Sequence, residues 1–362
     1  MFSDNSKISG RQLKRLIVMD WIGKAGLLLP RFTEKADGRS FMLSLLLGIG
    51  LTFVYACMVG WLSRHVDTDF YDYIKERLGI GAAWLVGILY TCYAFVNTVF
   101  MIRLFAVIAS LFMLPETAQI LLMLMVLAGG YFIAAGGLEV RARVGEILYG
   151  VVLYPLALML LFAAFSINPE YLGPGKASYS IQTLKHGLQM FIAFGGMGIF
   201  LFIAPYVTKR EKMGHYLKKA VVISCTSVFF IFLISIGAFG ESGMRAMAWP
   251  ALTLMSSAKI PGGFLQRWDV IFTGLLLVSF FISVGTGLFY MRFLTERVLA
   301  KKSNVYLPVL TLLALVASVW CGSYETAARV FTVVNGYILV PLAVLFTIFL
   351  VVLEYVKGRR KG

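Results

Sequence analysis

Uncharged stretches about as long as a bilayer is thick recur along this chain. Nine stretches of 21 to 25 residues lack Asp, Glu, Lys and Arg: 40–63, 78–102, 117–138, 147–169, 186–208, 220–240, 270–291, 303–324 and 330–353. A membrane-spanning helix needs about 20 apolar residues. A tenth apolar segment, 16–30, is interrupted only by Asp20 and Lys24. The pattern therefore predicts ten membrane-spanning segments.

These segments are predicted to be helices, because a single strand leaves its backbone N–H and C=O groups unsatisfied in a bilayer. Barrel strands alternate polar and apolar residues, whereas these stretches are apolar on every side. The expected helices are 8–30, 40–63, 80–112, 117–137, 145–166, 182–207, 220–240, 267–298, 304–321 and 330–356. An amphipathic segment, 67–78, is expected to lie on the membrane surface, and a short helix is expected after Trp249-Pro250. The chain is therefore predicted to be an all-α polytopic membrane protein with a single domain.

Composition and charge support this class. Hydrophobic residues make up 59% of the 362 residues and charged residues 14%, against about 25% charged in soluble domains. This excludes a soluble globular protein, a disordered chain and a nucleic-acid binder, although the net charge is +15. With the N-terminus inside, the predicted inner segments hold 22 Lys and Arg residues and the outer segments hold 9. The positive-inside rule then predicts that both termini are cytoplasmic. The first apolar segment carries two charges and lacks an obvious small-residue cleavage site, so it is expected to be a retained helix.

Two of the predicted helices carry glycine clusters that favour an interruption. The first holds Gly23-Lys24-Ala25-Gly26, and the sixth holds Gly195-Gly196-Met197-Gly198 after Phe194. The first and sixth of ten spans correspond if the protein is two five-helix halves in opposite orientation. We therefore expect an inverted repeat with broken helices 1 and 6, its halves spanning 8–166 and 182–356. The alternative is that both clusters only permit close helix packing.

Interrupted helices at corresponding positions point to a transporter binding site at mid-membrane. The N–H end of a broken helix suits a carboxylate, and its carbonyl end suits an ammonium group. The expected site for a free amino acid comprises Gly23, Lys24, Ala25, Gly26, Phe194, Gly195, Gly196, Met197 and Gly198. Tyr93 and Asn97, four residues apart on the third helix, are expected to join it.

Ionisable and hydroxyl residues within the spans suggest ion or proton coupling. Asp20 and Lys24 share one face of the first helix, and intramembrane charges are usually functional. The alternative is a structural ion pair between them. Ser279, Ser283 and Thr286 form one polar stripe on the eighth helix, unless they only bond back to their own helix. No metal-ligand spacing, cofactor motif or catalytic constellation is present in the sequence, so neither a metal site nor an enzyme is expected.

Two stretches resemble a known family. Residues 7–13 and 22–30 resemble the start of the spore germination permeases, the B subunits of germinant receptors in the amino acid–polyamine–organocation superfamily. Residues 249–252 and 260–269 are similar to that family's outer connection into helix 8. The resemblance implies the five-plus-five fold, a small nutrient ligand, and partnership with an A subunit and a C lipoprotein. Lys24 and Asp269 depart from the family's pattern, where a small or polar residue and a glutamate are expected.

The sequence therefore favours a germinant-receptor subunit that binds a small nutrient, such as an amino acid, in the spore inner membrane. A proton-coupled amino-acid transporter of the bacterial cell membrane is the alternative, because it would have the same fold and the same site. Uptake of a labelled amino acid into proteoliposomes would separate the two.

Overall fold

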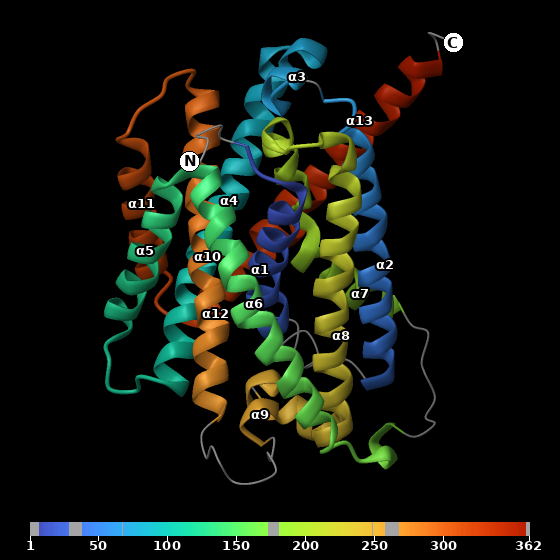
Figure 1. Cartoon of the computed structure of the whole chain (residues 1–362), viewed down its shortest axis with the longest axis vertical. Coiled ribbons are helices and arrows are strands. Elements are labelled where there is room, and N and C mark those ends of the chain that lie inside the picture. The colour runs from blue at the N-terminus through green and yellow to red at the C-terminus, as the bar shows by residue number, and fades with distance from the viewer. Residues whose placement is uncertain are drawn as a thin grey trace.

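The computed structural model describes residues 7–28, 38–66, 68–172, 181–247, 249–257 and 268–359. These residues form a bundle of helices, and they contain no strand beyond an isolated bridge between Ile8 and Val207 (Figure 1). The first-half helices are α1 (Gly10–Leu28), α2 (Gly38–Leu62), α3 (Phe70–Leu78), α4 (Ile80–Phe112), α5 (Gln119–Ala135), α6 (Gly137–Ala164) and the short η2 (Pro169–Leu172). The second-half helices are α7 (Ile181–Phe194), η3 (Gly195–Tyr206), η4 (Arg210–Lys212), α8 (Met213–Ala246), α9 (Pro250–Ser257), α10 (Trp268–Val298), α11 (Tyr306–Trp320), α12 (Tyr324–Val330), η5 (Phe331–Leu339) and α13 (Val340–Arg359).

The helices confirm an all-α membrane protein. Within the described residues, seven helical stretches are long and apolar enough to cross a membrane, and α5 and α11 are shorter apolar helices. With the more charged α1, they match the ten predicted spans one to one. The amphipathic α3 and the short α9 also form where the sequence predicts them.

Three helical spans begin at least six residues earlier than the sequence suggests, and the last of them starts at Tyr324 of α12 instead of 330. α6 starts at Gly137 instead of 145, and α8 starts at Met213 instead of 220. The first turns of α6 hold an ion pair between Glu139 and Arg143, four residues apart, which stabilises a helix end. A membrane helix therefore continues past the last uncharged residue, and Arg141 lies within α6 rather than in a loop.

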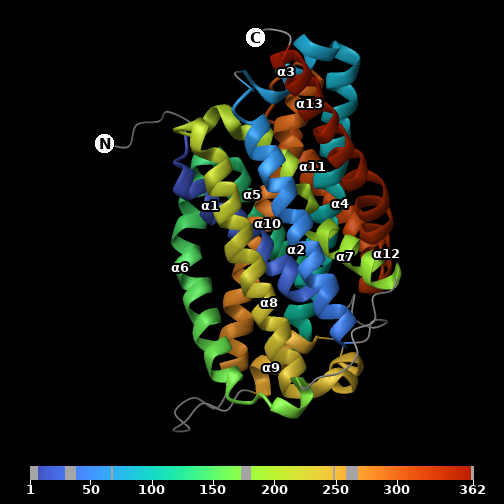
Figure 2. The same ribbon diagram turned by 90° about the vertical axis from the view of Figure 1, so that its right-hand side faces the viewer.

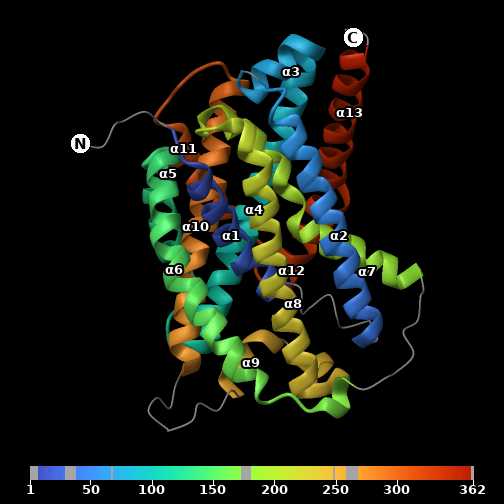
Figure 3. The same cartoon turned by 45° about the vertical axis from the view of Figure 1, so that its right-hand side comes forward.

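Both described ends of the chain lie at one end of the bundle, together with α3 (Figure 2). We call this the terminus-bearing end. The helix packing is reciprocal, because α1 contacts α8 while α2 contacts α7, and α4 packs against α10. Such exchange of neighbours is what a five-plus-five inverted repeat requires. Figure 3 shows α1 inside the bundle, where it contacts α6, α8 and α10.

The two predicted helix interruptions have different outcomes. In the sixth span, α7 ends at Phe194 and a 12-residue 3₁₀ segment, η3, starts at Gly195, so this interruption is confirmed. A 3₁₀ run longer than three or four residues is uncommon and often marks a functional hinge. In the first span, α1 is a continuous α-helix through Gly23 and Gly26 to Leu28, so that prediction was wrong.

The glycine in α1 serves packing instead. A Cβ added at Gly23 would overlap the Ser279 hydroxyl of α10. Small residues let membrane helices approach closely, and this close approach explains the glycine without a broken backbone.

A set of polar contacts closes the terminus-bearing end of the bundle. The Ile8 N–H donates to the Tyr206 carbonyl at 2.8 Å, which fixes the entry to α1 against the end of η3. Arg297, in the last turn of α10, pairs with Asp69 at 2.8 Å and with Asp72 at 3.8 Å. Its guanidinium also donates to the Tyr206 hydroxyl at 3.4 Å. Burial raises the pKa of the Asp69 carboxyl above its ordinary value, and the nearby Arg297 opposes that rise.

Candidate functional site

A small polar cavity lies where η3 meets α1, α4 and α10. Its volume is about 20 Å³, which is room for about one water molecule. Asp20 lies ten residues into α1, so the cavity is about 15 Å from the terminus-bearing end and near the middle of the bundle. The lining residues are Asp20, Trp21, Tyr93, Ala94, Asn97, Gly196, Ile199, Phe200, Thr286, Gly287 and Tyr290.

The cavity collects buried polar groups that lack hydrogen-bond partners. Asn97 is 4% exposed and Thr286 is 6% exposed. The Asn97 Oδ1 atom and the hydroxyls of Thr286 and Tyr290 have no partner among the described residues. Buried polar atoms in native proteins are almost always paired with protein, water or ligand. These unpartnered atoms make the cavity the candidate site for a small polar molecule.

The glycine cluster of the sixth span shapes one wall of this cavity. Gly196 lines it, and a Cβ added there would overlap the Tyr93 hydroxyl and ring. Gly195 faces Val340 of α13, and Gly198 faces the Tyr90 hydroxyl. Gly196 is thus the cluster member that a bound molecule would meet, and Tyr93 covers it in this conformation.

The other two predicted members of this stretch lie behind the wall. Phe194 is buried and packs edge-on against Trp21, with ring centroids 5.3 Å apart. Met197 is fully buried and does not line the cavity. Phe194 thus packs behind the lining residue Trp21, and Met197 belongs to the hydrophobic core.

The polar stripe of α10 faces α1. The Ser283 hydroxyl donates to the Asp20 backbone carbonyl at 3.1 Å. The Ser279 hydroxyl donates to Leu276 of its own helix at 2.6 Å and lies beside Gly23. Thr286 lines the cavity. The structure thus brings Asp20, Ser283 and Thr286 together, while Ser279 is bonded within its own helix.

Several predicted residues lie outside the described part. The side chains of Lys24 and Ala25 are not described, although their backbone belongs to α1, as does that of Gly26. Residues 260–267 of the second motif are also outside it, as is the Asp269 side chain.

Sequence reasoning missed the aromatic and small members of the lining. Trp21, Ala94, Ile199, Phe200, Gly287 and Tyr290 line the cavity, yet in a membrane helix such residues indicate only packing. The sequence interpretation also placed Arg141 in an inner loop. The structure instead buries Arg141 completely, with its guanidinium carbon 5.1 Å from the ring centroid of the cavity residue Tyr290.

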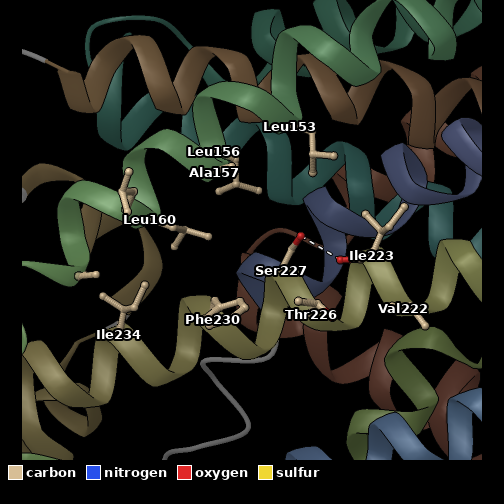
Figure 4. Close-up of a pocket in the computed structure, with 12 residues that line it drawn as sticks. Leu153, Leu156, Ala157, Leu160, Val222, Ile223, Thr226, Ser227, Phe230 and Ile234 are labelled. Atoms are coloured by element: carbon tan, nitrogen blue, oxygen red, sulfur yellow. Dashed lines mark hydrogen bonds between the residues drawn. The ribbon is translucent and has the colours of Figure 1, made fainter.

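A larger cavity, of about 570 Å³, lies between α6 and α8, but its lining is apolar (Figure 4). Its Ser227 hydroxyl already donates to the Ile223 carbonyl at 2.9 Å. It therefore offers little to recognise a polar molecule. No group of three or more His, Cys, Asp and Glu residues suited to a metal ion occurs in the described part of the chain.

Sequence comparison identifies related proteins. A family model described as "Spore germination protein" matches residues 7–330. Spore germination protein KB of Bacillus subtilis (strain 168) is 26% identical over 369 residues, covering 99% of this chain and 97% of that protein. Spore germination protein A2 of the same organism is 23% identical, covering 93% of each. Spore germination protein YndE, also from that organism, is 29% identical over 280 residues, covering 74% of this chain and 75% of that protein.

Structural comparison finds transporters of the same fold. The crystal structure of MhsT in complex with L-phenylalanine has a TM-score of 0.68 at 15% identity, covering 93% of this chain and 87% of that one. A manganese transporter of Eremococcus coleocola has a TM-score of 0.64 at 13% identity, covering 96% and 78%. At such identities the likeness shows the fold alone, and it confirms the transporter-like bundle.

Proposed function

Because the chain belongs to the spore germination protein family, we propose that it is the membrane subunit of a germinant receptor and binds a free amino acid at the cavity between α1, η3, α4 and α10. The observation that carries the proposal is the set of unpartnered polar atoms on Asn97, Thr286 and Tyr290. They meet the Gly196 wall at mid-depth in the bundle. MhsT, which has this fold, is bound to L-phenylalanine in its crystal structure.

The size of the cavity supports a sensing role. A space of about 20 Å³ holds about one water molecule, so an amino acid enters only if side chains such as Tyr93 move. A ligand that binds one conformation better than another shifts the population toward it. Binding at this site would therefore change the conformation of the bundle, and a receptor subunit can transmit that change to its A subunit and C lipoprotein partners.

Binding is tested directly with the purified protein. Each of the proteinogenic amino acids is titrated against the protein in detergent, with bound radiolabel as the readout. We expect one or a few to bind, and Asn97→Ala to weaken them, because it removes a polar partner inside the cavity. Val151→Ala, at an exposed position on α6, serves as the control. If no amino acid binds, the proposed ligand class is wrong.

The second candidate, a proton-coupled transporter, is favoured by the fold shared with MhsT. Proteoliposomes loaded with buffer and offered the binding amino acid distinguish the two roles. A receptor binds the amino acid without accumulating it, whereas a transporter accumulates it when a proton gradient is imposed. Copurification with the A subunit and the C lipoprotein tests the receptor assembly separately.

We assign ion or proton coupling to Asp20, Lys24, Ser279, Ser283 and Thr286. The support is that Ser283 links α10 to the Asp20 carbonyl and that Thr286 lines the same cavity as Asp20. If the Lys24 ammonium replaces a bound cation, binding needs no sodium and Lys24→Met abolishes it. If Asp20 and Lys24 form only an ion pair, the double variant Asp20→Asn/Lys24→Met recovers the binding that Lys24→Met loses.

A further inference from the structure

Among the side chains that the structure describes, none that lines the proposed amino-acid site is a cation for the carboxylate, and a buried arginine beside the site supplies one. We propose that Arg141 of α6 receives the carboxylate of the bound amino acid once Tyr290 moves aside. This inference rests on the proposed function and names the residue that selects its ligand class.

Burying the Arg141 side chain among apolar neighbours alone would be energetically unfavourable. The residue is 0% exposed, and none of its three side-chain nitrogens has a hydrogen bond among the described residues. Its guanidinium instead stacks on two rings of α10, 4.4 Å from the Phe289 centroid and 5.1 Å from that of Tyr290. A guanidinium carries five N–H donors, so most of its hydrogen-bonding capacity is unused.

Stacking does not offset this burial. A cation–π contact is weaker than the penalty for removing a guanidinium from water, even after the surroundings relax. The Tyr290 hydroxyl and, less strongly, the Asp20 carboxylate interact electrostatically with Arg141, which lowers the cost without giving its N–H groups well-formed hydrogen bonds. A carboxylate would provide acceptors for these N–H groups, because its two oxygens can bind the guanidinium in a bidentate contact.

The backbone of α1 does not provide the other usual way of binding a carboxylate. A broken first helix would offer free N–H groups to a carboxylate. Here α1 is a continuous α-helix from Gly10 to Leu28, so its interior N–H groups are engaged by carbonyls one turn earlier. The cavity itself presents the Asp20 carboxylate and the Asn97 Oδ1 acceptor, which suit an ammonium group. The carboxylate of the same ligand then requires a cation, and among the described residues Arg141 is a fully buried one that contacts a lining residue.

The Tyr290 side chain lies between the cavity and Arg141. Its ring lines the cavity and also carries the stacked Arg141, and its hydroxyl has no partner among the described residues. Displacing this ring enlarges the cavity on the side of α6 and exposes the guanidinium in one movement. Entry of the carboxylate and contact with Arg141 are thereby coupled.

The test compares amino acids with their carboxamides, which keep the amino group and replace the carboxylate by a neutral amide. The probes are L-alanine, L-valine and L-phenylalanine, each paired with its carboxamide, and the measured quantity is the ratio of the two dissociation constants. We expect the unaltered protein to prefer at least one acid over its amide by about 30-fold or more, since losing a buried charge pair costs about 2 kcal/mol or more. In Arg141→Gln this ratio falls to about 1, and Arg141→Lys retains part of it.

Arg143→Gln is the matched control, because Arg143 lies on the same helix and pairs with Glu139 near the surface. It should leave the ratio unchanged. If Arg141→Gln does not fold, Tyr290→Phe and Arg141→Lys provide the ratio instead, and Tyr290→Phe should keep it while Arg141→Lys lowers it.

Three results would overturn the inference. If Arg141→Gln weakens acid and amide equally, Arg141 is structural. If it binds the acid as tightly as the unaltered protein does, the carboxylate lies elsewhere, and amino-acid binding at the cavity still stands. If none of these acids, nor any other amino acid, binds the unaltered protein, the proposed function fails and this inference fails with it.

Discussion

Gly196 and Tyr93 share a space in the cavity wall that has room for one side chain. A Cβ on residue 196 would overlap the Tyr93 hydroxyl and ring. We therefore expect Gly196→Ala to weaken amino-acid binding about tenfold or more while the protein remains folded and inserted, because Tyr93 is pushed into the cavity. Gly196→Leu should abolish binding. Radioligand binding by the purified variants measures both effects.

Gly50→Ala is the control for the effect of removing a helical glycine. Gly50 lies in α2 with open space around its added Cβ, so alanine should be neutral or should stabilise by up to about 1 kcal/mol. The double variant Gly196→Ala/Tyr93→Leu should regain part of the lost binding, because the smaller leucine relieves the overlap. Normal binding by Gly196→Leu alone would mean that the glycine serves only packing.

Two serines of one stripe have different roles, and substitution separates them. The Ser283 hydroxyl bridges α10 to the Asp20 carbonyl, whereas the Ser279 hydroxyl bonds within α10. Ser283→Ala should destabilise the protein by about 1 kcal/mol and weaken ligand binding, because it loosens α1 against α10. Ser279→Ala should change both by less. Thermal unfolding in detergent measures the difference, and equal effects would contradict the bridging role.

At the residue scale, the sequence reveals polar cavity residues but not apolar ones. Asp20, Asn97 and Thr286 were predictable, because a polar side chain inside an apolar span is costly and needs a reason. Trp21, Phe200 and Tyr290 carry no such signal, since aromatic residues are common in any packed membrane helix. Arg141 was missed because a charge is ordinarily taken to end a span, whereas here its guanidinium is buried against two aromatic rings.

At the element scale, the helices were predictable because a bilayer imposes both their length and their composition. α4 runs from Ile80 to Phe112, as its sequence predicts. A glycine cluster is less decisive, since the same residues permit either a break or a close crossing. Gly195 begins a 3₁₀ segment, while Gly23 provides a crossing with α10. Whether a glycine cluster breaks its helix or permits a close crossing depends on the side chains of the helix packed against it. Those contacts are set by the tertiary structure and cannot be read from the cluster itself.

The ion pair between Arg297 and Asp69 ties α10 to the segment before α3, and its strength should depend on pH. Arg297→Gln leaves the Asp69 carboxylate buried without its cation, at a cost of about 1–3 kcal/mol at about pH 8. Burial already raises the pKa of Asp69, and removing Arg297 raises it further. The folded variant then holds its proton more tightly than the unfolded chain does. The cost should therefore shrink as the pH falls toward about 5.

Arg292→Gln is the matched control on the same helix. Arg292 pairs with Glu296 four residues later at 2.9 Å, and such a helical pair contributes about 0.5 kcal/mol or less. The thermal midpoints of both variants are measured at the two pH values. A loss in Arg297→Gln that is the same at both values would show that the Asp69 carboxylate does not carry the effect.

At the scale of the whole molecule, an even number of crossings brings both ends of the chain to one end of the bundle (Figure 1). The sequence predicts this from its ten spans, and the reciprocal packing of α1 on α8 and α2 on α7 agrees with it. Which side of the membrane that end faces depends on the basic residues. The sequence assigns 22 of them to the inner segments and 9 to the outer ones. The structure buries one of the 22, Arg141, within α6, and the remaining excess still predicts that the terminus-bearing end is cytoplasmic.

Cysteine labelling tests that orientation. In a background in which Cys57, Cys92, Cys225 and Cys321 are replaced, single cysteines are placed at positions 212, 302 and 176. Lys212 and Lys302 are exposed at the terminus-bearing end. Lys176 lies outside the described residues, between η2 and α7 in the sequence, and the ten-span topology predicts that it is on the other side of the membrane. A membrane-impermeant maleimide applied to intact cells should label only Lys176→Cys, whereas inverted vesicles should expose Lys212→Cys and Lys302→Cys. The reverse pattern would show that the orientation is inverted while the ten-span bundle is preserved.

Labelling of Lys212→Cys and Lys176→Cys from the same side would contradict the ten-span bundle itself, because an odd number of crossings must separate those two positions.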